Sequence, residues 1–195
     1  MRRDYRTGND YKHRFAFPSV FPDTFRYVPV LFVDDDTILG PDMLAIGDAS
    51  HCEFRILSSD AHMACLKAVV GSADGRFTYT VNRVYNNFVW PDKDMLTDEL
   101  RAAVENAARL IEAARDAHPE FTFGRCYPTD AMPPDIAEAH RINDRAVRAA
   151  YGLSPDATEC EVMSFLMNRY SEPAEAAKSA GVVRDRERPA ARWRR

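Results

Sequence analysis

The sequence has few of the residues that hold small folds together covalently or through a metal ion. It contains four cysteines, Cys52, Cys65, Cys126 and Cys160, and no Cys-x-x-Cys pair. Spacings this wide exclude a dense disulfide framework and the usual zinc motifs. His51 and Cys52 are adjacent, which leaves two interpretations: a metal-binding pair, or neighbours on a half-buried strand, which we favour. We therefore expect a reduced, cytoplasmic protein.

Long apolar runs are also missing. No stretch approaches the roughly 20 apolar residues that cross a bilayer. Residues 1–14 are polar and mixed in charge, so we expect neither a membrane span nor a secretory signal. The hydrophobic content of 46% is nevertheless that of an ordinary globular protein with a core.

The net charge of −4 argues against a nucleic-acid binder whose whole surface is basic. The charge is unevenly distributed, however, because the basic residues gather at the two ends of the chain. A basic face or stripe is sufficient for binding nucleic acid, so this class of partner stays open. The terminal basic residues are Arg2, Arg3, Arg6, Lys12 and Arg14, and Arg184, Arg186, Arg188, Arg192, Arg194 and Arg195.

Three segments in the first third of the chain have strand-like patterns. Residues 26–33 are β-branched and aromatic, and Pro29 within them favours an edge strand. Residues 43–46 form a second apolar run. In residues 51–57 apolar and polar side chains alternate, which predicts a half-buried strand. The three aspartates 34–36 are either a turn, which we favour, or a carboxylate trio for a metal.

The spacing of apolar residues becomes helical after residue 57. Ser58 and Ser59 are candidate caps, Asp60 suits the first turn of a helix, and Gly71 ends it. His62 and Met63 on this helix are expected to be structural. Two short strands, residues 76–79 and 81–85, are expected next. Tyr85, Asn86, Asn87, Phe88 and Trp90 then favour a packed junction, its amides bonded to turn backbone, over a DNA contact.

From Thr97 onward the chain is predicted to be helical. An apolar stripe from Leu100 to Ala114 predicts one helix, and Pro133 and Pro134 open a second that Gly152 closes. Thr158 and Glu161 have capping-box spacing for a third. The predicted fold class is α+β: a small mixed strand and helix portion (residues 1–91), an all-α helical domain (92–171), and an arginine-rich tail (172–195) expected to be disordered.

Several blocks of the sequence match a known pattern. Residues 54–71 run from a presumed strand through Ser-Ser into a His-Met helix that ends in glycine, and Phe77-Thr-Tyr-Thr80 precedes Val84-Tyr-Asn-Asn-Phe-Val-Trp-Pro91. They resemble the MmeI-like restriction-modification enzymes, large bacterial proteins that join a nuclease, an adenine-N6 methyltransferase and a target-recognition domain. Val89 stands where the family usually has proline. Residues 127–135, 140–147, 150–152 and 165–170 resemble the helical C-terminal domain of the family. The resemblance implies that residues 1–91 are the C-terminal portion of a DNA target-recognition domain and residues 92–171 the helical C-terminal domain.

The catalytic motifs of such an enzyme are missing from this sequence. A methyltransferase of this kind needs a glycine-rich turn to hold S-adenosylmethionine and an Asn/Asp-Pro-Pro-aromatic loop for the flipped adenine. The eight glycines include no Gly-x-Gly, and Met132-Pro-Pro-Asp135 has only the prolines of that loop. We expect no catalytic, cofactor-binding or metal-binding residue here, S-adenosylmethionine belonging to the parent enzyme. Asp10 and Lys12 have the spacing of a nuclease motif, but no Pro-Asp strand element precedes them.

Seven residues are candidate DNA contacts. Arginine can bond bidentately to guanine and asparagine to adenine, which makes Arg83 the first candidate for a base contact. A lysine or a helix start can bind phosphate. Each candidate also has a structural alternative: a solvated strand face or salt bridge for the arginines, and a simple cap for the serines. The full set is Arg83, Asn82, Arg76 and Arg55 for bases, and Lys67, Ser58 and Ser59 for phosphate.

The resemblance implies the DNA-recognition and scaffolding portion of a site-specific DNA adenine-N6 methyltransferase, with the catalytic part absent or on a separate chain. The implied partners are double-stranded DNA and a methyltransferase catalytic domain or chain, with no membrane. A second hypothesis stays open: a free-standing DNA-binding specificity subunit or partner-docking module without catalysis.

Overall fold

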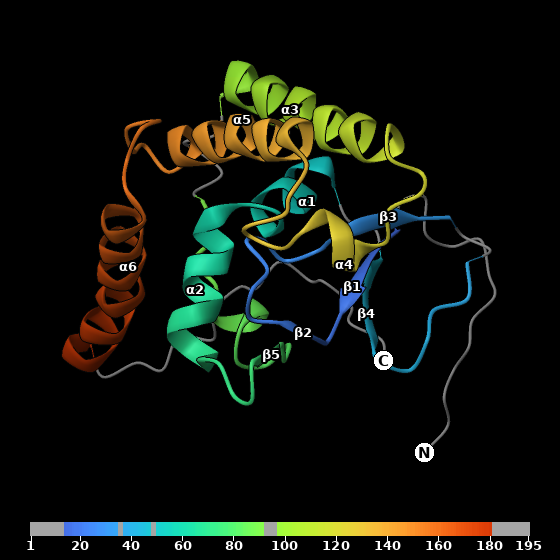
Figure 1. Cartoon of the computed structure of the whole chain (residues 1–195). Coiled ribbons are helices and arrows are strands. Elements are labelled where there is room, and N and C mark those ends of the chain that lie inside the picture. The colour runs from blue at the N-terminus through green and yellow to red at the C-terminus, as the bar shows by residue number, and fades with distance from the viewer. Residues whose placement is uncertain (1–13, 35–36, 48–49, 92–96, 181–195) are drawn as a thin grey trace.

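The computed structural model describes residues 14–34, 37–47, 50–91 and 97–180 (Figure 1). Strands and short helices make up the first half of the chain and long helices the second, so the fold class is α+β, as predicted. The elements are β1 (Arg14–Pro18), β2 (Val20–Pro22), β3 (Leu31–Val33), β4 (Met43–Gly47), α1 (His51–Leu57), α2 (Asp60–Val70), β5 (Arg76–Thr78), the 3₁₀ turn η1 (Tyr85–Asn87), α3 (Asp98–Asp116), α4 (Phe123–Cys126), α5 (Pro134–Ala150) and α6 (Glu159–Ala180).

The strands form two small antiparallel sheets. One has the order β3-β1-β4 and the other pairs β2 with β5. The edge position predicted from Pro29 is confirmed, since β3 lies at the edge of its sheet. Only residues 31–33 pair there, however: Pro29 has no N–H to donate, and Arg26 N donates to Tyr127 O at 3.0 Å instead of to a strand.

The strand predicted at residues 51–57 is wrong, because these residues form helix α1. Ser50 and Glu53 build a capping box: Glu53 N donates to Ser50 Oγ at 3.2 Å, and Ser50 N donates to Glu53 Oε2 at 2.7 Å. Four consecutive residues, 54 to 57, are buried. A strand with one solvated face buries only alternate residues, so the apparent alternation was too short to distinguish the two structures.

The second short strand, predicted at residues 81–85, is also wrong. These residues form a turn that leads into η1. The amide of Asn87 donates to the carbonyls of Asn82 at 2.9 Å and Arg83 at 3.1 Å, which holds the turn closed. Tyr85 and Phe88 are buried. The packed junction favoured for this motif is therefore present, but only the Asn87 amide bonds turn backbone, since the Asn86 amide donates to the side chain of Asn82.

Helices α2, α3, α5 and α6 begin where the sequence predicts, whereas the short helix α4 was not predicted. Ser59 caps α2, Thr97 caps α3, Pro134 lies in the first turn of α5, and Thr158 with Glu161 forms the capping box of α6. Helix α6 continues to Ala180, so the tail begins later than expected. The alanine- and glutamate-rich residues 174–178 favour helix, which accounts for the extension. Residues 181–195 lie outside the described part.

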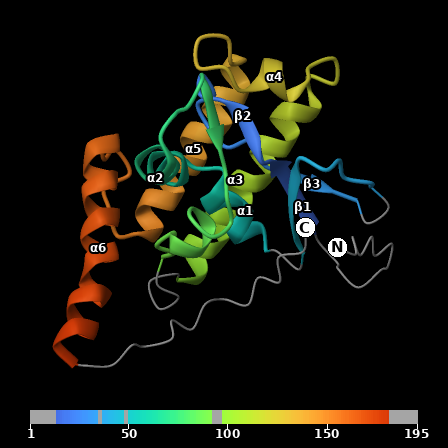
Figure 2. The same ribbon diagram turned by 90° about the horizontal axis from the view of Figure 1, so that it is seen from below.

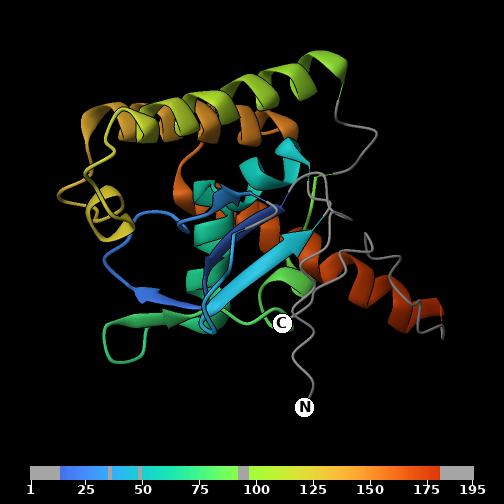
Figure 3. The same ribbon diagram turned by 90° about the vertical axis from the view of Figure 1, so that its right-hand side faces the viewer.

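Two hydrophobic cores tie the halves of the chain together. The larger joins Phe15, Phe17 and Phe77 from the strands to Tyr127 and Ile136 from the second half. The smaller joins α2 and the Phe88 segment to the end of α5 and to α6. Figures 1 and 3 show α3 and α5 side by side over α1 and the sheets, while Figure 2 shows α6 standing beside α2. Within the described ranges no helix is long and apolar enough to cross a membrane.

Candidate nucleic-acid interface

The N-terminus of α2 is buried against α5. Ser58 is 1% and Ser59 0% exposed, and the free backbone N–H of Asp60 donates to Asp144 Oδ1 at 2.9 Å. Ser59 Oγ accepts from His62 N at 3.4 Å, and the ring Nδ1 of His140 lies 3.0 Å from Ser58 O. An internal carboxylate therefore occupies the place that a phosphate would take. Ser58 and Ser59 are buried caps, which favours the structural alternative over a phosphate contact.

The contact between the start of α2 and helix α5 is called the seam below, and Asp144 lies at its centre. Its Oδ2 accepts from Tyr27 Oη at 2.7 Å, and Arg148 pairs with the neighbouring Asp60. Burial and the nearby charge of Asp60 raise the pKa of the Asp144 carboxyl above its usual range. These bonds fix the angle at which α5 crosses the start of α2.

Arg55 is also part of the seam and not of the surface. Its side chain is 0% exposed, and Nη1 donates to Asn143 Oδ1 at 2.9 Å. Burial lowers the pKa of its guanidinium to about 9, so it remains a buried cation at neutral pH. The position of Arg55 on helix α1 turns its side chain inward, which favours a structural role over a base contact.

His62 and Met63 are structural, as predicted. Met63 is 1% exposed, and His62 Nε2 lies 3.0 Å from Tyr79 Oη. The His62 ring meets Phe88 edge-on, with ring centres 4.6 Å apart. Burial lowers the pKa of His62 to about 3, so the ring is neutral in the folded protein.

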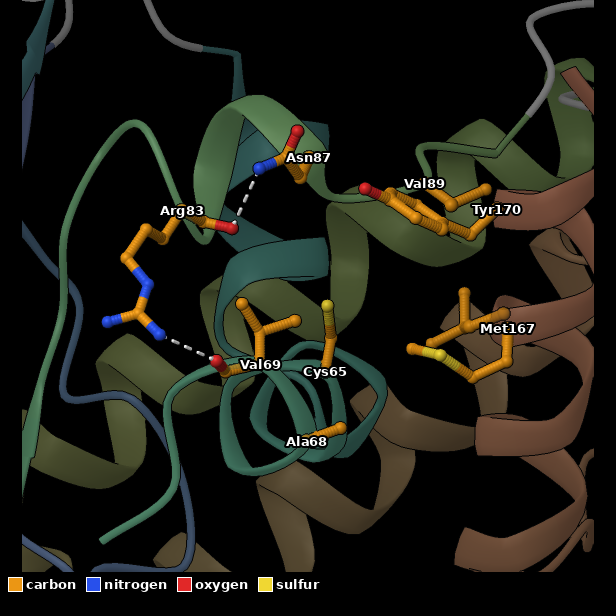
Figure 4. Close-up of a pocket in the computed structure, with 9 residues that line it drawn as sticks. Cys65, Ala68, Val69, Arg83, Asn87, Val89, Met167 and Tyr170 are labelled. Atoms are coloured by element: carbon orange, nitrogen blue, oxygen red, sulfur yellow. Dashed lines mark hydrogen bonds between the residues drawn. The ribbon is translucent and has the colours of Figure 1, made fainter. Parts of the chain in front are cut away.

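Arg83 and Asn82 lie exposed on the turn before η1. Arg83 Nη2 donates to Val69 O at 3.2 Å in the last turn of α2, where a cation is favoured by the helix dipole. Figure 4 shows this bond at one side of a pocket of about 170 Å³, with Cys65, Met167 and Tyr170 on the other sides. Asn82 Oδ1 accepts from Asn86 Nδ2 at 3.2 Å. Both candidates are thus accessible, but each already supports the turn.

Lys67 lies on the exposed side of α2. Its Nζ is 3.3 Å from Glu159 Oε1 of α6, and both side chains are largely exposed. Such a surface pair is weak, so the lysine remains available to an anion.

Arg76 lies on the two-stranded ribbon of β2 and β5. In both strands the middle residue, Phe21 or Phe77, is buried and the flanking residues are exposed. The register places Pro22 opposite Arg76 and Val20 opposite Thr78, all four on the solvent face. Among the described residues the Arg76 guanidinium has no hydrogen bond or ion pair. Of the candidates, Arg76 is therefore the one whose side chain contributes least to the stability of the fold.

A tight turn sets the end of this ribbon. Asp74 and Gly75 have positive φ values of 52° and 72°, and Arg76 N donates to Ala73 O at 3.1 Å. Two positive φ values in a row are typical of a type I′ turn, for which Asp-Gly is a favoured pair. The Asp74-Gly75 pair is thus a local sequence signal for this turn. The pairing of β5 with β2 had no such local signal.

The other sequence-level candidates do not come together as a site. His51 and Cys52 are half-buried, and the His51 ring packs 4.8 Å from the Phe32 ring. Across the described ranges no group of three or more His, Cys, Asp or Glu side chains is placed to hold a metal. Asp35, Asp36, Asp10, Lys12 and the arginines beyond residue 183 lie outside those ranges.

Comparisons with known proteins place the chain in a family. The model described as MmeI, target recognition domain, matches residues 2–92, and the one described as MmeI, C-terminal domain, matches residues 96–176. DNA methyltransferase A of Bacillus subtilis (strain 168) is 29% identical over 163 residues, 84% of this chain and 18% of that protein. The structure of the type IIL restriction-modification enzyme MmeI in complex with DNA is 28% identical, with a TM-score of 0.76 over 84% of this chain and 21% of that chain.

The chain therefore spans about a fifth of the length of these relatives. The matched ranges are the same two portions that the sequence blocks indicated, in the same order. The chain belongs to the MmeI-like family of restriction-modification enzymes, of which it contains the target-recognition and C-terminal domains.

Proposed function

We propose that this chain holds and reads double-stranded DNA for a site-specific adenine-N6 methyltransferase of a restriction-modification system. The observation that carries the proposal is an exposed, unengaged arginine on a β-ribbon of a target-recognition domain. One family model matches residues 2–92 and the other residues 96–176, which supports a proposal in which the first portion reads DNA and the second supports it. A cytoplasmic location is part of the proposal.

The ribbon has the shape that base reading requires. The major groove of B-DNA admits a two-stranded β-ribbon, and arginine is the side chain that most often bonds guanine there. Phe21 and Phe77 anchor the ribbon in the larger core, so Arg76 projects from a fixed backbone. A fixed backbone supports specificity, since a base contact must be held in one geometry to discriminate.

The charge around Arg76 favours bases over phosphates as its target. Asp74 is exposed at the turn, and Asp23 accepts from Ser72 Oγ at 2.5 Å beside it. Two carboxylates cancel the attraction that a phosphate backbone exerts on a single arginine. Arg76 therefore acts by directed hydrogen bonds, whereas Lys67 and the terminal arginines supply general attraction.

The residues present do not fit S-adenosylmethionine. The sequence has no glycine-rich turn, and the pocket beside Arg83 is lined mainly by apolar side chains, without a carboxylate. Methyl transfer is therefore assigned to a catalytic domain or chain outside these 195 residues, and no catalytic step is assigned to this chain.

The proposal is tested by selecting binding sites from random duplexes, with and without the catalytic protein of the system. We expect an enriched motif, and Arg76→Ala is expected to lose preference at one position while keeping its non-specific affinity. Arg109→Ala, an exposed arginine on α3, is the matched control. Selection without any enriched motif in both arms would refute the proposal. Incubation of the chain alone with S-adenosylmethionine and DNA is expected to yield no methylated adenine.

A further inference from the structure

We propose that Val20 on β2 reads the 5-methyl group of a thymine next to the base pair contacted by Arg76. This inference rests on the proposed function, because it requires the ribbon to enter the major groove. It adds to Arg76 a second specificity residue, from a strand that sequence patterns did not reveal.

Val20 is unusual among the valines near it. It is 42% exposed, whereas Val28 and Val30 are fully buried. Among the described residues, large apolar side chains with this much exposure are few: Ile38, Leu110, Met167 and Tyr170 are the others. Val20 shares a surface with the unengaged Arg76, because the register places it diagonally from Arg76 on the solvent face of the ribbon.

The chemistry of the major groove matches this pair of side chains. A thymine presents a C5-methyl group in the major groove, and apolar side chains contact it there, while guanine presents two acceptors suited to arginine. The minor groove offers no methyl group. A ribbon that displays a branched alkyl group beside a guanidinium therefore fits a thymine close to a guanine.

The position of Val20 is fixed by the backbone bonds of Ser19, which precedes it, and by the burial of Phe21, which follows it. Ser19 N donates to Asp42 O at 2.8 Å, and Tyr79 N donates to Ser19 O at 2.7 Å. Phe21 follows immediately and is 3% exposed. The branched side chain of valine is restricted at χ1, so its methyl groups are displayed with little loss of entropy on binding.

The geometry also predicts where the thymine lies. Diagonal neighbours on adjacent strands are about 7–8 Å apart, and successive bases along one strand are about 3.4 Å apart. The thymine should therefore lie within about two base-pair steps of the guanine that Arg76 contacts. Figure 1 shows β2 and β5 together at the lower edge of the fold, so the same duplex would meet both residues.

The test removes the methyl group of the thymine and the methyl groups of Val20 in separate experiments. Thymines of the selected site are replaced one at a time by uracil, which lacks only the methyl group, and affinities are measured for the wild-type chain and for Val20→Ala. One thymine near the Arg76-dependent position should lose about three- to fourfold in affinity on replacement by uracil. In Val20→Ala this loss should shrink, because alanine lacks the two γ-methyl groups that reach the thymine methyl.

Leu110→Ala is the matched control, since Leu110 is 44% exposed and lies on α3. This variant should keep the full response to uracil. The inference is overturned if no thymine responds to uracil in the wild-type chain, or if the response is as large in Val20→Ala as in the wild-type chain. In either case an intact Arg76-dependent preference would leave the proposed function standing, whereas loss of all sequence preference would remove both.

Discussion

Arg55 and Asn143, which are 88 residues apart in sequence, are joined by two hydrogen bonds. Arg55 Nη1 donates to Asn143 Oδ1 at 2.9 Å, and Asn143 Nδ2 donates to the backbone oxygen of Arg55 at 3.0 Å. Both side chains are fully buried. The pair therefore locks α5 of the C-terminal domain onto α1 of the target-recognition domain.

Asn143→Ala is expected to lower the free energy of unfolding by about 3 kcal/mol, because it leaves a buried guanidinium without its side-chain acceptor. Urea unfolding followed by circular dichroism measures the change. Arg141→Ala on the same helix removes only an exposed pair with Glu138, and should cost no more than about 1 kcal/mol. In the double variant Arg55→Met/Asn143→Leu part of the stability should return, since neither polar group remains. Equal effects of Asn143→Ala and Arg141→Ala would contradict the buried lock.

The helix that carries Arg55 could be predicted from the sequence, but the burial of its side chain could not. In the window 51–57, alternation fits a strand as well as a one-sided helix, and only the Ser50-x-x-Glu53 spacing distinguishes them. The capping-box spacing is a local feature of the sequence, so the helix could have been predicted from it. The burial of Arg55 could not be predicted in this way. Its partner Asn143 is on α5, 88 residues away, and no pattern in the first half of the chain indicates that contact.

The stability of the protein is expected to fall on acidification because His140 is buried and neutral. Burial and the nearby Arg115 lower the pKa of His140 to about 3. Between about pH 6.5 and 3 the unfolded chain therefore binds a proton that the folded chain does not. Each such histidine removes about 1.4 kcal/mol of stability per pH unit in this range. His62 contributes in the same direction, and the raised pKa of Asp144 in the opposite one.

The variant His140→Asn isolates this contribution. An asparagine amide can replace the ring Nδ1–H as donor to Ser58 O, yet it does not titrate. Urea unfolding between pH 7.5 and 4.5 should show a slope against pH that is smaller by one proton than that of the wild-type chain. An unchanged slope would mean that His140 is not the titrating group, whatever the variant does to absolute stability.

Arg83 and Arg76 are expected to behave differently, although both are exposed arginines. Arg83 bonds the last turn of α2, so Arg83→Ala should lower stability by about 0.3–1 kcal/mol. Its effect on DNA binding should be similar for all sequences, since the turn and not a base contact is altered. Melting temperatures and affinities for the selected site and for a scrambled duplex measure both effects. Loss of preference at a single base position in Arg83→Ala would instead identify Arg83 as a base contact.

Local signals predicted the helices of the second half well. Thr97, Pro134 and the pair Thr158 and Glu161 each mark a helix start where the structure has one. Strand β5 was predicted at residues 76–79, but β2 and its pairing with β5 were missed for a physical reason: β2 has only three residues and is stabilised by pairing with β5 and by Phe21 and Phe77 in the core. A strand of this length has no periodicity of its own, so the surface that presents Arg76 emerges only from tertiary pairing.

The turn at Asp74 and Gly75 connects the fold of the ribbon to its use. Gly75 has a φ of +72°, where a side chain is strained even though a Cβ would meet no atom within 4 Å. Gly75→Ala is therefore expected to cost about 1 kcal/mol of stability through the backbone alone. Gly124→Ala is the matched control, because Gly124 has no such φ and its Cβ would lie at an ordinary 3.7 Å from Thr122 Oγ1. If the turn sets the display of Arg76, Gly75→Ala should also reduce the affinity ratio between the selected and scrambled duplexes, while Gly124→Ala preserves it. If both variants keep the affinity ratio and only Gly75→Ala loses stability, the conformation of the turn does not affect DNA recognition.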